Sequence, residues 1–262
     1  MKKTPLPKLT IAEETRLRSF KSHEGWGISD PERFKQLMDE AVKLVPPGTY
    51  LGDNLFTWMR NVSAVEDSAF VQAWQSNVVN PGDETILWRR YILCCAACHC
   101  VHLPGDFAEC GVLFGTGVKT VIDYFGKDNF GKQFWAYDVF ETNPLEELPS
   151  QGQEEGVLER VRKRFSGYGN VKIVAGLLPA SLDGNSPDEI AYLHIDLNKA
   201  ETEIAVLERL FDRVVPGGIV ILDDYEWSGP YRKQKIKEDP WFEARQYRVI
   251  PLPTGQGLVL KR

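Results

Sequence analysis

The sequence predicts an α/β fold in which an open, mainly parallel sheet is covered by helices on both faces. From residue 104 onward, short apolar runs alternate with helical patterns, which is the order that repeated β-α-β units require. Before that point, apolar residues recur at three- and four-residue intervals, a spacing typical of amphipathic helices. The final stretch, YRVIPLPTGQGLVLKR, predicts two strands joined by a glycine-containing turn, so an antiparallel hairpin is expected at one edge of the sheet.

These patterns divide the chain into three segments. Residues 1–30 are polar and weakly patterned, and we expect an arm or lid there. Residues 31–103 are predicted to form a helical cap with helices over 31–45, 64–76 and 84–102. Residues 104–262 are predicted to form the core, with strands over 106–109, 133–138, 171–175, 190–196 and 218–223 and helices over 116–124, 154–165 and 201–214.

Composition and charge indicate a globular protein that does not bind nucleic acid. Hydrophobic residues make up 43% and charged residues 26% of the 262 residues, which is typical of a chain with a packed core. The formal net charge of −6 argues against a nucleic-acid backbone as partner. No apolar run is long enough to span a bilayer, and the first ten residues lack the apolar stretch of a signal peptide, so we expect a cytoplasmic protein without membrane contact.

Four of the five cysteines lie between Cys94 and Cys100. A metal site could use Cys95, Cys98, His99 and Cys100. The segment reads as a buried helix, however, and free cysteines commonly serve as small buried residues. No second cysteine pair completes a zinc site, so the structural interpretation is favoured.

A glycine-rich loop follows the first predicted core strand. The segment 109–117 reads ECGVLFGTG and leads directly into a helix, so its glycines allow a sharp turn and close approach of a ligand. The spacing G-x-x-x-G-x-G differs from the G-x-G-x-x-G of dinucleotide-binding proteins and matches that of S-adenosylmethionine-dependent methyltransferases. A simple strand-to-helix turn is the alternative. The predicted cofactor-binding residues of this loop are Glu109, Cys110, Gly111, Gly115 and Gly117.

Two further residues support a nucleoside ligand at the same edge of the sheet. Asp138 ends the next predicted strand, from which a carboxylate can bond both ribose hydroxyls. Gly176 follows the third strand and permits close approach near an adenine. In open α/β sheets, ligands bind beyond the carboxyl ends of the strands, so S-adenosylmethionine is the expected cofactor.

An acidic cluster is predicted beside the cofactor. Asp196 ends the fourth strand, and Asp223 and Asp224 end the fifth. Three converging carboxylates repel one another unless they are protonated or neutralised by a cation. Oxygen ligands suit Mg²⁺ or another hard divalent cation, which could lower the pKa of an acceptor hydroxyl. Helix-capping or turn roles for these aspartates are the alternative.

The ordered series of motifs resembles the macrocin O-methyltransferase family, which modifies natural products. The similarity runs from about Thr49 to the C-terminus, through GDNLF, LWRRYIL, DFAECGVLFGTG, AYDVFE, LHID, VPGGIVILDDY and LPTGQG. It implies a Rossmann-like, seven-stranded methyltransferase sheet, a helical cap over the cofactor, a homodimer, and Mg²⁺ held by the residues matching Asp196, Asp223 and Asp224. It also places Thr49, Tyr50 and Thr57 in the region that closes over the methionine carboxylate, and Thr57 is a predicted cofactor-binding residue.

Asn198 departs from the family pattern. Members commonly carry an acid two positions after the first metal-binding aspartate, where it suits a general base, whereas an asparagine accepts no proton at neutral pH. His194 is a tempting substitute, but a core histidine is the favoured interpretation. Tyr225, Glu226 and His23 are other candidates. Asp196 and Asn198 remain the predicted catalytic pair.

The leading functional hypothesis is a metal-assisted O-methyltransferase acting on a hydroxyl of a small molecule, either a sugar or a phenolic natural product. A protein that binds S-adenosylmethionine without transferring the methyl group, degenerate at Asn198, is the alternative. An NAD-dependent oxidoreductase is disfavoured by the glycine spacing. Four aromatic residues are expected either to line the acceptor pocket or to pack in the core: Trp227, Tyr231, Trp241 and Phe242.

Overall fold

A computed structural model describes residues 4–8, 18–141 and 155–262. Its main feature is a seven-stranded sheet with the strand order β6-β5-β4-β7-β8-β10-β9. The predicted α/β class is thereby confirmed. The strands are β4 (Asp106–Cys110), β5 (Phe134–Asp138), β6 (Val171–Ala175), β7 (Ile190–Ile195), β8 (Val214–Leu222), β9 (Ile250–Pro251) and β10 (Gly257–Leu260).

The terminal hairpin is also confirmed. Strands β4 to β8 run parallel, whereas β10 pairs antiparallel with both β8 and β9. β8 begins four residues before its predicted start, because the sequence Pro216-Gly217 reads as a chain break. In the structure, the Gly217 amide donates to the carbonyl of Lys261, so the hairpin extends the strand across that point.

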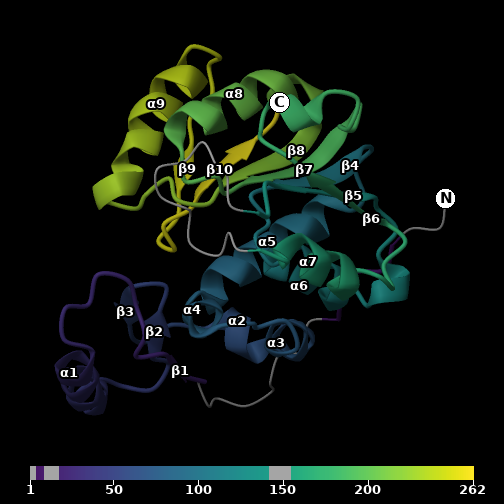
Figure 1. Ribbon diagram of the computed structural model, residues 1–262. Helices are drawn as coiled ribbons and strands as arrows, with labels where there is room; N and C mark the ends of the chain where they lie inside the picture. The colour runs from purple at the N-terminus through teal and green to yellow at the C-terminus, as the bar shows by residue number, and fades with distance from the viewer. Residues whose placement is uncertain (1–3, 9–17, 142–154) are drawn as a thin grey trace.

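Helices cover both faces of the sheet (Figure 1). α8 and α9 lie on one face over an apolar cluster that includes Cys110, Leu193 and Val220. α3, α5, α6 and α7 contribute to the cluster on the other face, with Phe107 and Tyr192 from the strands. The helices are α1 (Pro31–Lys43), α2 (Ser63–Glu66), α3 (Ser68–Gln75), α4 (Pro81–Thr85), α5 (Leu87–Cys100), α6 (Thr116–Tyr124), α7 (Val157–Arg164), α8 (Ala200–Leu210) and α9 (Arg232–Glu243).

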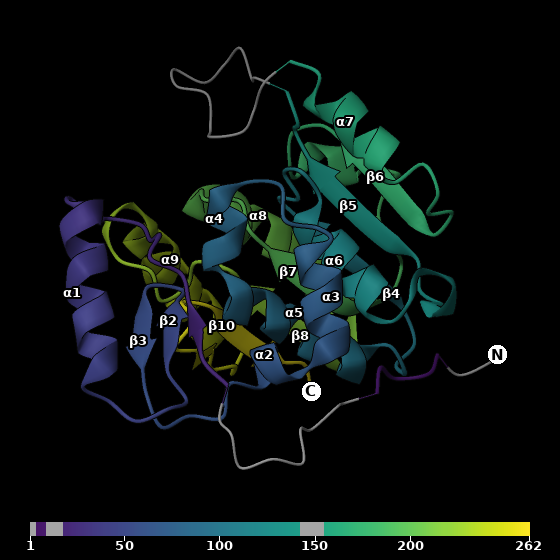
Figure 2. The same cartoon turned by 90° about the horizontal axis from the view of Figure 1, so that it is seen from below.

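The N-terminal part contains a small sheet that the sequence did not predict. β1 (Phe20–Lys21) pairs parallel with β2 (Tyr50–Gly52), which forms a hairpin with β3 (Leu55–Thr57). Strands of two or three residues are too short to show an alternating pattern. Figure 2 shows this sheet and α1 at the opposite end of the molecule from β6 and α7.

Two predicted cap helices are each divided in the structure. The first breaks at Asp67, whose carboxylate caps α3 by accepting from the Phe70 amide. The second breaks at Ile86, between α4 and α5. The predicted helix over 154–165 is α7, and its expected first residue lies outside the described residues.

The cysteines of α5 have the structural role favoured from the sequence. Cys94 and Cys100 are buried in the apolar cluster beneath the sheet, and all five cysteines are free. Burial raises the pKa of the Cys95 thiol to about 11 and those of Cys98 and Cys100 to about 12, so these groups are neutral thiols. Within the described ranges, no helix has the length and apolarity needed to cross a bilayer.

Candidate active site

The carboxyl ends of five parallel strands bring the predicted site residues to one edge of the sheet. Asp138 is in register with Ala175, directly before Gly176. The amide of Asp196 donates to the carbonyl of Cys110, and the amide of Asp223 donates to that of Ile195. The loops after β4, β5, β6, β7 and β8 are therefore joined at this edge, which we call the carboxyl edge.

The glycine loop requires its first glycine for steric reasons. Gly111 has a φ of 92°, and a Cβ there would lie 1.7 Å from the Asp196 carbonyl oxygen. The Asp138 carboxylate accepts hydrogen bonds from the amides of Leu113 and Phe140, at 2.7 and 2.9 Å, and so ties the loop to the end of β5. Asp138 is thus placed against the loop, as a ribose-binding carboxylate requires.

The other predicted cofactor-binding residues differ in whether they face the glycine loop. Gly115 and Gly117 begin α6, and Gly117 faces Glu109, with a hypothetical Cβ 2.9 Å from the Glu109 Oε1. The Cys110 side chain belongs to the cluster on the α8–α9 face, so only its backbone faces the loop. Thr57 lies in β3, paired with Tyr50, and does not line the cavity described below.

A chain of buried ion pairs crosses the carboxyl edge. His194 lies 3.0 Å from a Glu109 oxygen through Nδ1 and 3.1 Å from an Asp223 oxygen through Nε2. Asp223 in turn pairs with Arg89 Nη1 at 2.5 Å, and that nitrogen also lies 3.1 Å from Asp224. We call Glu109, His194, Asp223, Arg89 and Asp224 the buried charge chain.

The charge chain fixes the protonation of its members. Burial would lower the pKa of His194, but the charge of Glu109 and the hydrogen bonds with Asp223 and Glu109 raise it to about 10. Burial would raise the pKa of Asp223, but Arg89 and His194 hold it well below its usual range. His194 is therefore an imidazolium at neutral pH and has no lone pair for a metal or for a substrate proton.

Asp196 differs from the other two carboxylates. Burial and the charges of Asp223 and Asp224 raise its pKa. Burial and the charge of Asp223 raise the pKa of Asp224 to about 6. Among the described residues, however, only Asp196 of the three carboxylates has no hydrogen-bond or ion-pair partner.

Two segments distant in sequence position Arg89. In the GDNLF motif, Asp53 lies in the β2–β3 turn and its carboxylate accepts from the amides of Trp88 and Arg89, at 3.0 and 3.1 Å, at the start of α5. The C-terminal LPTGQG motif supplies the carbonyl of Thr254, which accepts from Arg89 Nη2, and Gln256, which donates to Asp223 at 2.8 Å. Both motifs therefore support the charge chain.

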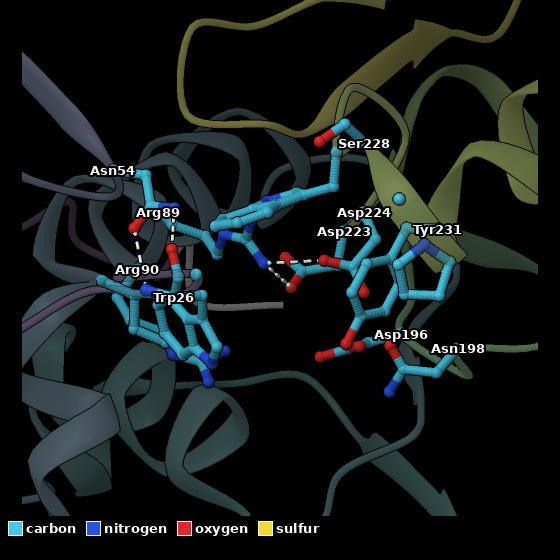
Figure 3. Close-up of a pocket in the computed structure, with 15 residues that line it drawn as sticks. Trp26, Asn54, Arg89, Arg90, Asp196, Asn198, Asp223, Asp224, Ser228 and Tyr231 are labelled. Carbon is cyan, nitrogen blue, oxygen red and sulfur yellow. Dashed lines mark hydrogen bonds and ion pairs between the residues drawn. The ribbon is translucent and has the colours of Figure 1, made fainter. Parts of the chain in front are cut away.

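A cavity of about 390 Å³ opens beside this chain (Figure 3). Its size is in the range that accommodates a small-molecule ligand. Figure 3 shows the ring of Tyr231 extending toward Asp196. The lining residues are Trp26, Gly27, Asn54, Ile86, Arg89, Arg90, Asp196, Asn198, Asp223, Asp224, Trp227, Ser228, Gly229, Pro230 and Tyr231.

Aromatic residues from two parts of the chain line the cavity. Trp26 and Trp227 meet edge to face, with ring centroids 5.7 Å apart. The Asn54 side chain holds Trp26 through two hydrogen bonds to its backbone, at 3.1 and 3.0 Å. Trp241 and Phe242 instead pack on Phe211 in the core, so only two of the four proposed pocket aromatics line the cavity.

Comparison with known proteins identifies the family to which the chain belongs. Residues 91–238 match the model of the macrocin O-methyltransferase family (TylF). The chain belongs to this family.

A curated relative is the 8-demethyl-8-(2,3-dimethoxy-alpha-L-rhamnosyl)-tetracenomycin-C 4′-O-methyltransferase of Streptomyces olivaceus. It is 30% identical over 142 residues, which are 47% of this chain and 54% of that protein. The chain therefore spans about half the length of this relative.

Solved structures show the same fold. CalS11, described as a calicheamicin methyltransferase, is 16% identical over 92% of this chain and 99% of its own, with a TM-score of 0.57. The O-methyltransferase NovP is 20% identical over 68% of this chain and 81% of its own, with a TM-score of 0.55. The methyltransferase PaMTH1 of Podospora anserina, solved with S-adenosylhomocysteine (SAH), is 12% identical over 91% and 99%, with a TM-score of 0.53.

Asn198, where macrocin O-methyltransferases commonly have an acid, lines the cavity near Asp196. It is exposed and has a φ of 58°. The three other proposed bases do not line the cavity: the Tyr225 hydroxyl donates to Asp239, Glu226 pairs with Lys235, and His23 pairs with Asp39.

Proposed function

We propose that this protein is an S-adenosylmethionine-dependent O-methyltransferase that acts on a hydroxyl of a small molecule. The observation that carries the proposal is the position of the cavity, which opens at the carboxyl edge beside the glycine loop and contains Asp196, Asp223 and Asp224. A methyl donor in the loop would therefore point toward an acceptor held over carboxylates. The acceptor hydroxyl would release its proton to solvent water, and its oxygen would form a bond to the methyl carbon as the carbon–sulfur bond breaks, so that SAH leaves as a neutral thioether.

The acceptor class follows from the lining of the cavity. Trp26, Trp227 and Tyr231 offer flat apolar surfaces, and Asn198 with the carboxylates offers hydrogen-bond partners for hydroxyl groups. A sugar ring or a phenolic ring presents both an apolar face and hydroxyls. We therefore propose a sugar or phenolic natural product as the acceptor.

The carboxylates also fit a divalent cation, although Arg89 already neutralises part of their charge. His194, Asp196 and Asp223 have potential ligand atoms within 4.8 Å of one another, but both nitrogens of His194 face carboxylates. Oxygen atoms are therefore the candidate metal ligands. Among the described residues, the Asp196 carboxylate has no hydrogen-bond or ion-pair partner, and one oxygen of Asp224 accepts no hydrogen bond. We propose Mg²⁺ held by Asp196, Asp223 and Asp224, where its charge would lower the pKa of an acceptor hydroxyl.

The chain itself would orient the acceptor and exclude water. Tyr231 and Asn198 border the cavity near Asp196 and can position a hydroxyl there, while Trp26 and Trp227 also line the cavity and contact each other. Positioning of this kind can contribute several kcal/mol to lowering a reaction barrier.

The test is a screen of rhamnosides, other deoxysugars and catechols with methyl-labelled S-adenosylmethionine and Mg²⁺, read by mass spectrometry. Labelled ether product is expected, and its loss is expected in excess chelator and in Asp196→Ala, with SAH affinity retained in that variant. Turnover unaffected by chelator would remove the metal from the proposal. Intact SAH binding without product from any acceptor would instead favour a cofactor-binding protein that transfers no methyl group, and Asn198→Asp would then be the variant to test for recovered activity.

We further propose that the protein forms a homodimer. α1 has no buried residue, and Leu37 and Leu44 are 42% and 85% exposed, so its apolar side is free to contact a second copy. Light scattering should give twice the chain mass, falling to the chain mass in a Leu37→Glu, Leu44→Glu variant. A monomeric wild-type protein would contradict this.

A further inference from the structure

Two consecutive arginines at the start of α5 differ in their direct pairing, although neighbouring carboxylates outweigh burial and raise the pKa of both guanidinium groups. Arg89 is fully paired: its Nη1 contacts Asp223 and Asp224, its Nη2 donates to the Thr254 carbonyl, and it stacks on Trp227 with its guanidinium 5.3 Å from the ring centroid. Arg90 is not. Its nearest ion-pair partner is Asp83 at 4.0 Å, and its buried Nε has no hydrogen-bond partner among the described residues.

The poor pairing of Arg90 needs an explanation, because its side chain is only 12% exposed. A guanidinium carries five N–H donors, and leaving a buried charged donor without an acceptor is unfavourable. Arg90 lines the cavity, so a bound ligand can reach it. The arrangement therefore indicates that an anionic group of a ligand completes the pairing.

The place of the guanidinium indicates which ligand. Arg90 Nη1 lies 3.1 Å from the position that a Cβ of Gly117 would occupy, in the first turn of α6 directly after the glycine loop. In the proposed function the methyl donor lies in this loop, so its methionine end can reach the start of α6. Glu109 flanks the same position, with its two oxygens at 2.9 and 3.1 Å.

One cation and one carboxylate thus lie close to the same residue, Gly117, which has no side chain. The methionine end of the cofactor carries an α-carboxylate and an α-ammonium group, which match these two charges. His194 holds one oxygen of Glu109 in the charge chain and so fixes the orientation of its carboxylate. Charge-assisted hydrogen bonds to a carboxylate are also the strongest that an arginine forms.

We propose that Arg90 binds the α-carboxylate of the cofactor's methionine moiety and that Glu109 receives its α-ammonium group. The inference rests on the proposed use of S-adenosylmethionine. It adds a residue, Arg90, that lies outside the glycine loop and comes from a different helix. The free amides at the start of α6 add a weaker attraction for the same carboxylate.

The experiment compares ligands that differ in the amino-acid end, by calorimetric titration of the wild-type protein and Arg90→Met. SAH has both charged groups, whereas 5′-methylthioadenosine has neither. We expect Arg90→Met to bind SAH about 10- to 100-fold more weakly, the loss typical of a charge-assisted hydrogen bond, and to bind methylthioadenosine within about threefold of wild type. Arg90→Lys, which keeps the charge without the planar fork, should lie between.

Two controls keep the result interpretable. Arg162→Met, on the exposed side of α7 and 56% exposed, should bind both ligands as wild type does. Decarboxylated S-adenosylmethionine lacks only the carboxylate, so the wild-type protein alone should bind it about 10- to 100-fold more weakly than S-adenosylmethionine. That measurement needs no variant to fold.

The inference is overturned if the wild-type protein binds S-adenosylmethionine and its decarboxylated form equally. It is also overturned if Arg90→Met, shown to be folded by a cooperative thermal unfolding transition, has its affinities for SAH and methylthioadenosine lowered by the same factor, or has neither lowered. A wild-type protein that binds none of the nucleosides would instead contradict the proposed function, and the role of Arg90 with it.

Discussion

The two walls of the cavity are built in different ways. The core wall contains Asp196, Asp223 and Asp224. Behind it, Glu109 and His194 are at most 2% exposed and are linked to Asp223 by ion pairs across three neighbouring strands. On the cap wall, Trp26 is 45% exposed and is held by two hydrogen bonds to Asn54, which lies in the turn between β2 and β3 of the three-stranded sheet.

The difference indicates a division of labour. A buried, mutually paired set of charges can take few substitutions, because each removal leaves a partner charged and buried. An exposed aromatic held by one side chain can change with little effect on the rest of the fold. We infer that the core wall fixes the chemistry and the cap wall selects the acceptor.

The largest expected effect is on the core wall, in Asp223→Ala. The variant leaves Arg89 and His194 without their shared carboxylate, which should lower the free energy of unfolding by about 3–5 kcal/mol and abolish activity. Urea denaturation measures the change. Asp212→Ala, whose side chain is 93% exposed, is the matched control and should change stability by less than about 0.5 kcal/mol. Equal stability in the two variants would show that the charge chain does not support the fold.

An intermediate effect is expected behind the core wall, where Glu203 and Glu238 meet between α8 and α9. Burial and the nearby charges of Asp239 and Asp224 raise the pKa of Glu238 to about 7, and burial and Glu238 raise that of Glu203. The folded protein therefore holds a proton that the unfolded chain releases above about pH 4.5. Stability from this pair is thus lost as pH rises toward and through 7.

Glu238→Gln removes one titrating group and should flatten this dependence. Relative to wild type, we expect the variant to gain roughly 1–3 kcal/mol at pH 8 and little at pH 5. Thermal or urea unfolding from pH 5 to 8 measures it, with Glu159→Gln on the surface as the control. If the free energy of unfolding changes by the same amount from pH 5 to 8 in the wild-type protein and in both variants, Glu203 and Glu238 share no proton.

The smallest effect is expected on the cap wall, in Asn54→Ala. Loss of both hydrogen bonds to Trp26 should raise the acceptor KM about 3- to 10-fold, as expected for about 1 kcal/mol, with kcat and the melting temperature nearly unchanged. Asn54→Asp, which can still accept from the Trp26 amide, should lie between. A variant with a lower kcat and an unchanged KM would show that Asn54 supports the chemical step and does not select the acceptor.

Much of the core wall could be predicted from the sequence, because its signals are local. The glycine loop, Asp138 and Asp196 each follow a short apolar run, and parallel strands bring such positions to one edge. The partners of these residues are not local. Arg89 and Asp223 are 134 residues apart, and no spacing rule connects them.

The cap wall was largely missed for a related reason. Its strands have two or three residues, and Asp53 and Asn54 act through a turn that resembles any other polar turn in the sequence. Arg90 was overlooked because an arginine on a predicted helix is usually solvated. Two adjacent arginines on an otherwise apolar helix were the available signal, since both cannot face water when the helix packs on a sheet.

The central claim is that the carboxyl edge binds an S-adenosyl nucleoside and not a dinucleotide. Calorimetric titration with SAH and with NAD, for the wild-type protein, Asp138→Ala and Asp224→Ala, tests it. We predict binding of SAH and not of NAD, an affinity about 10- to 100-fold lower in Asp138→Ala, and an affinity within about threefold of wild type in Asp224→Ala. Binding of NAD in preference to SAH, or SAH affinity that depends on Asp224 and not on Asp138, would contradict it.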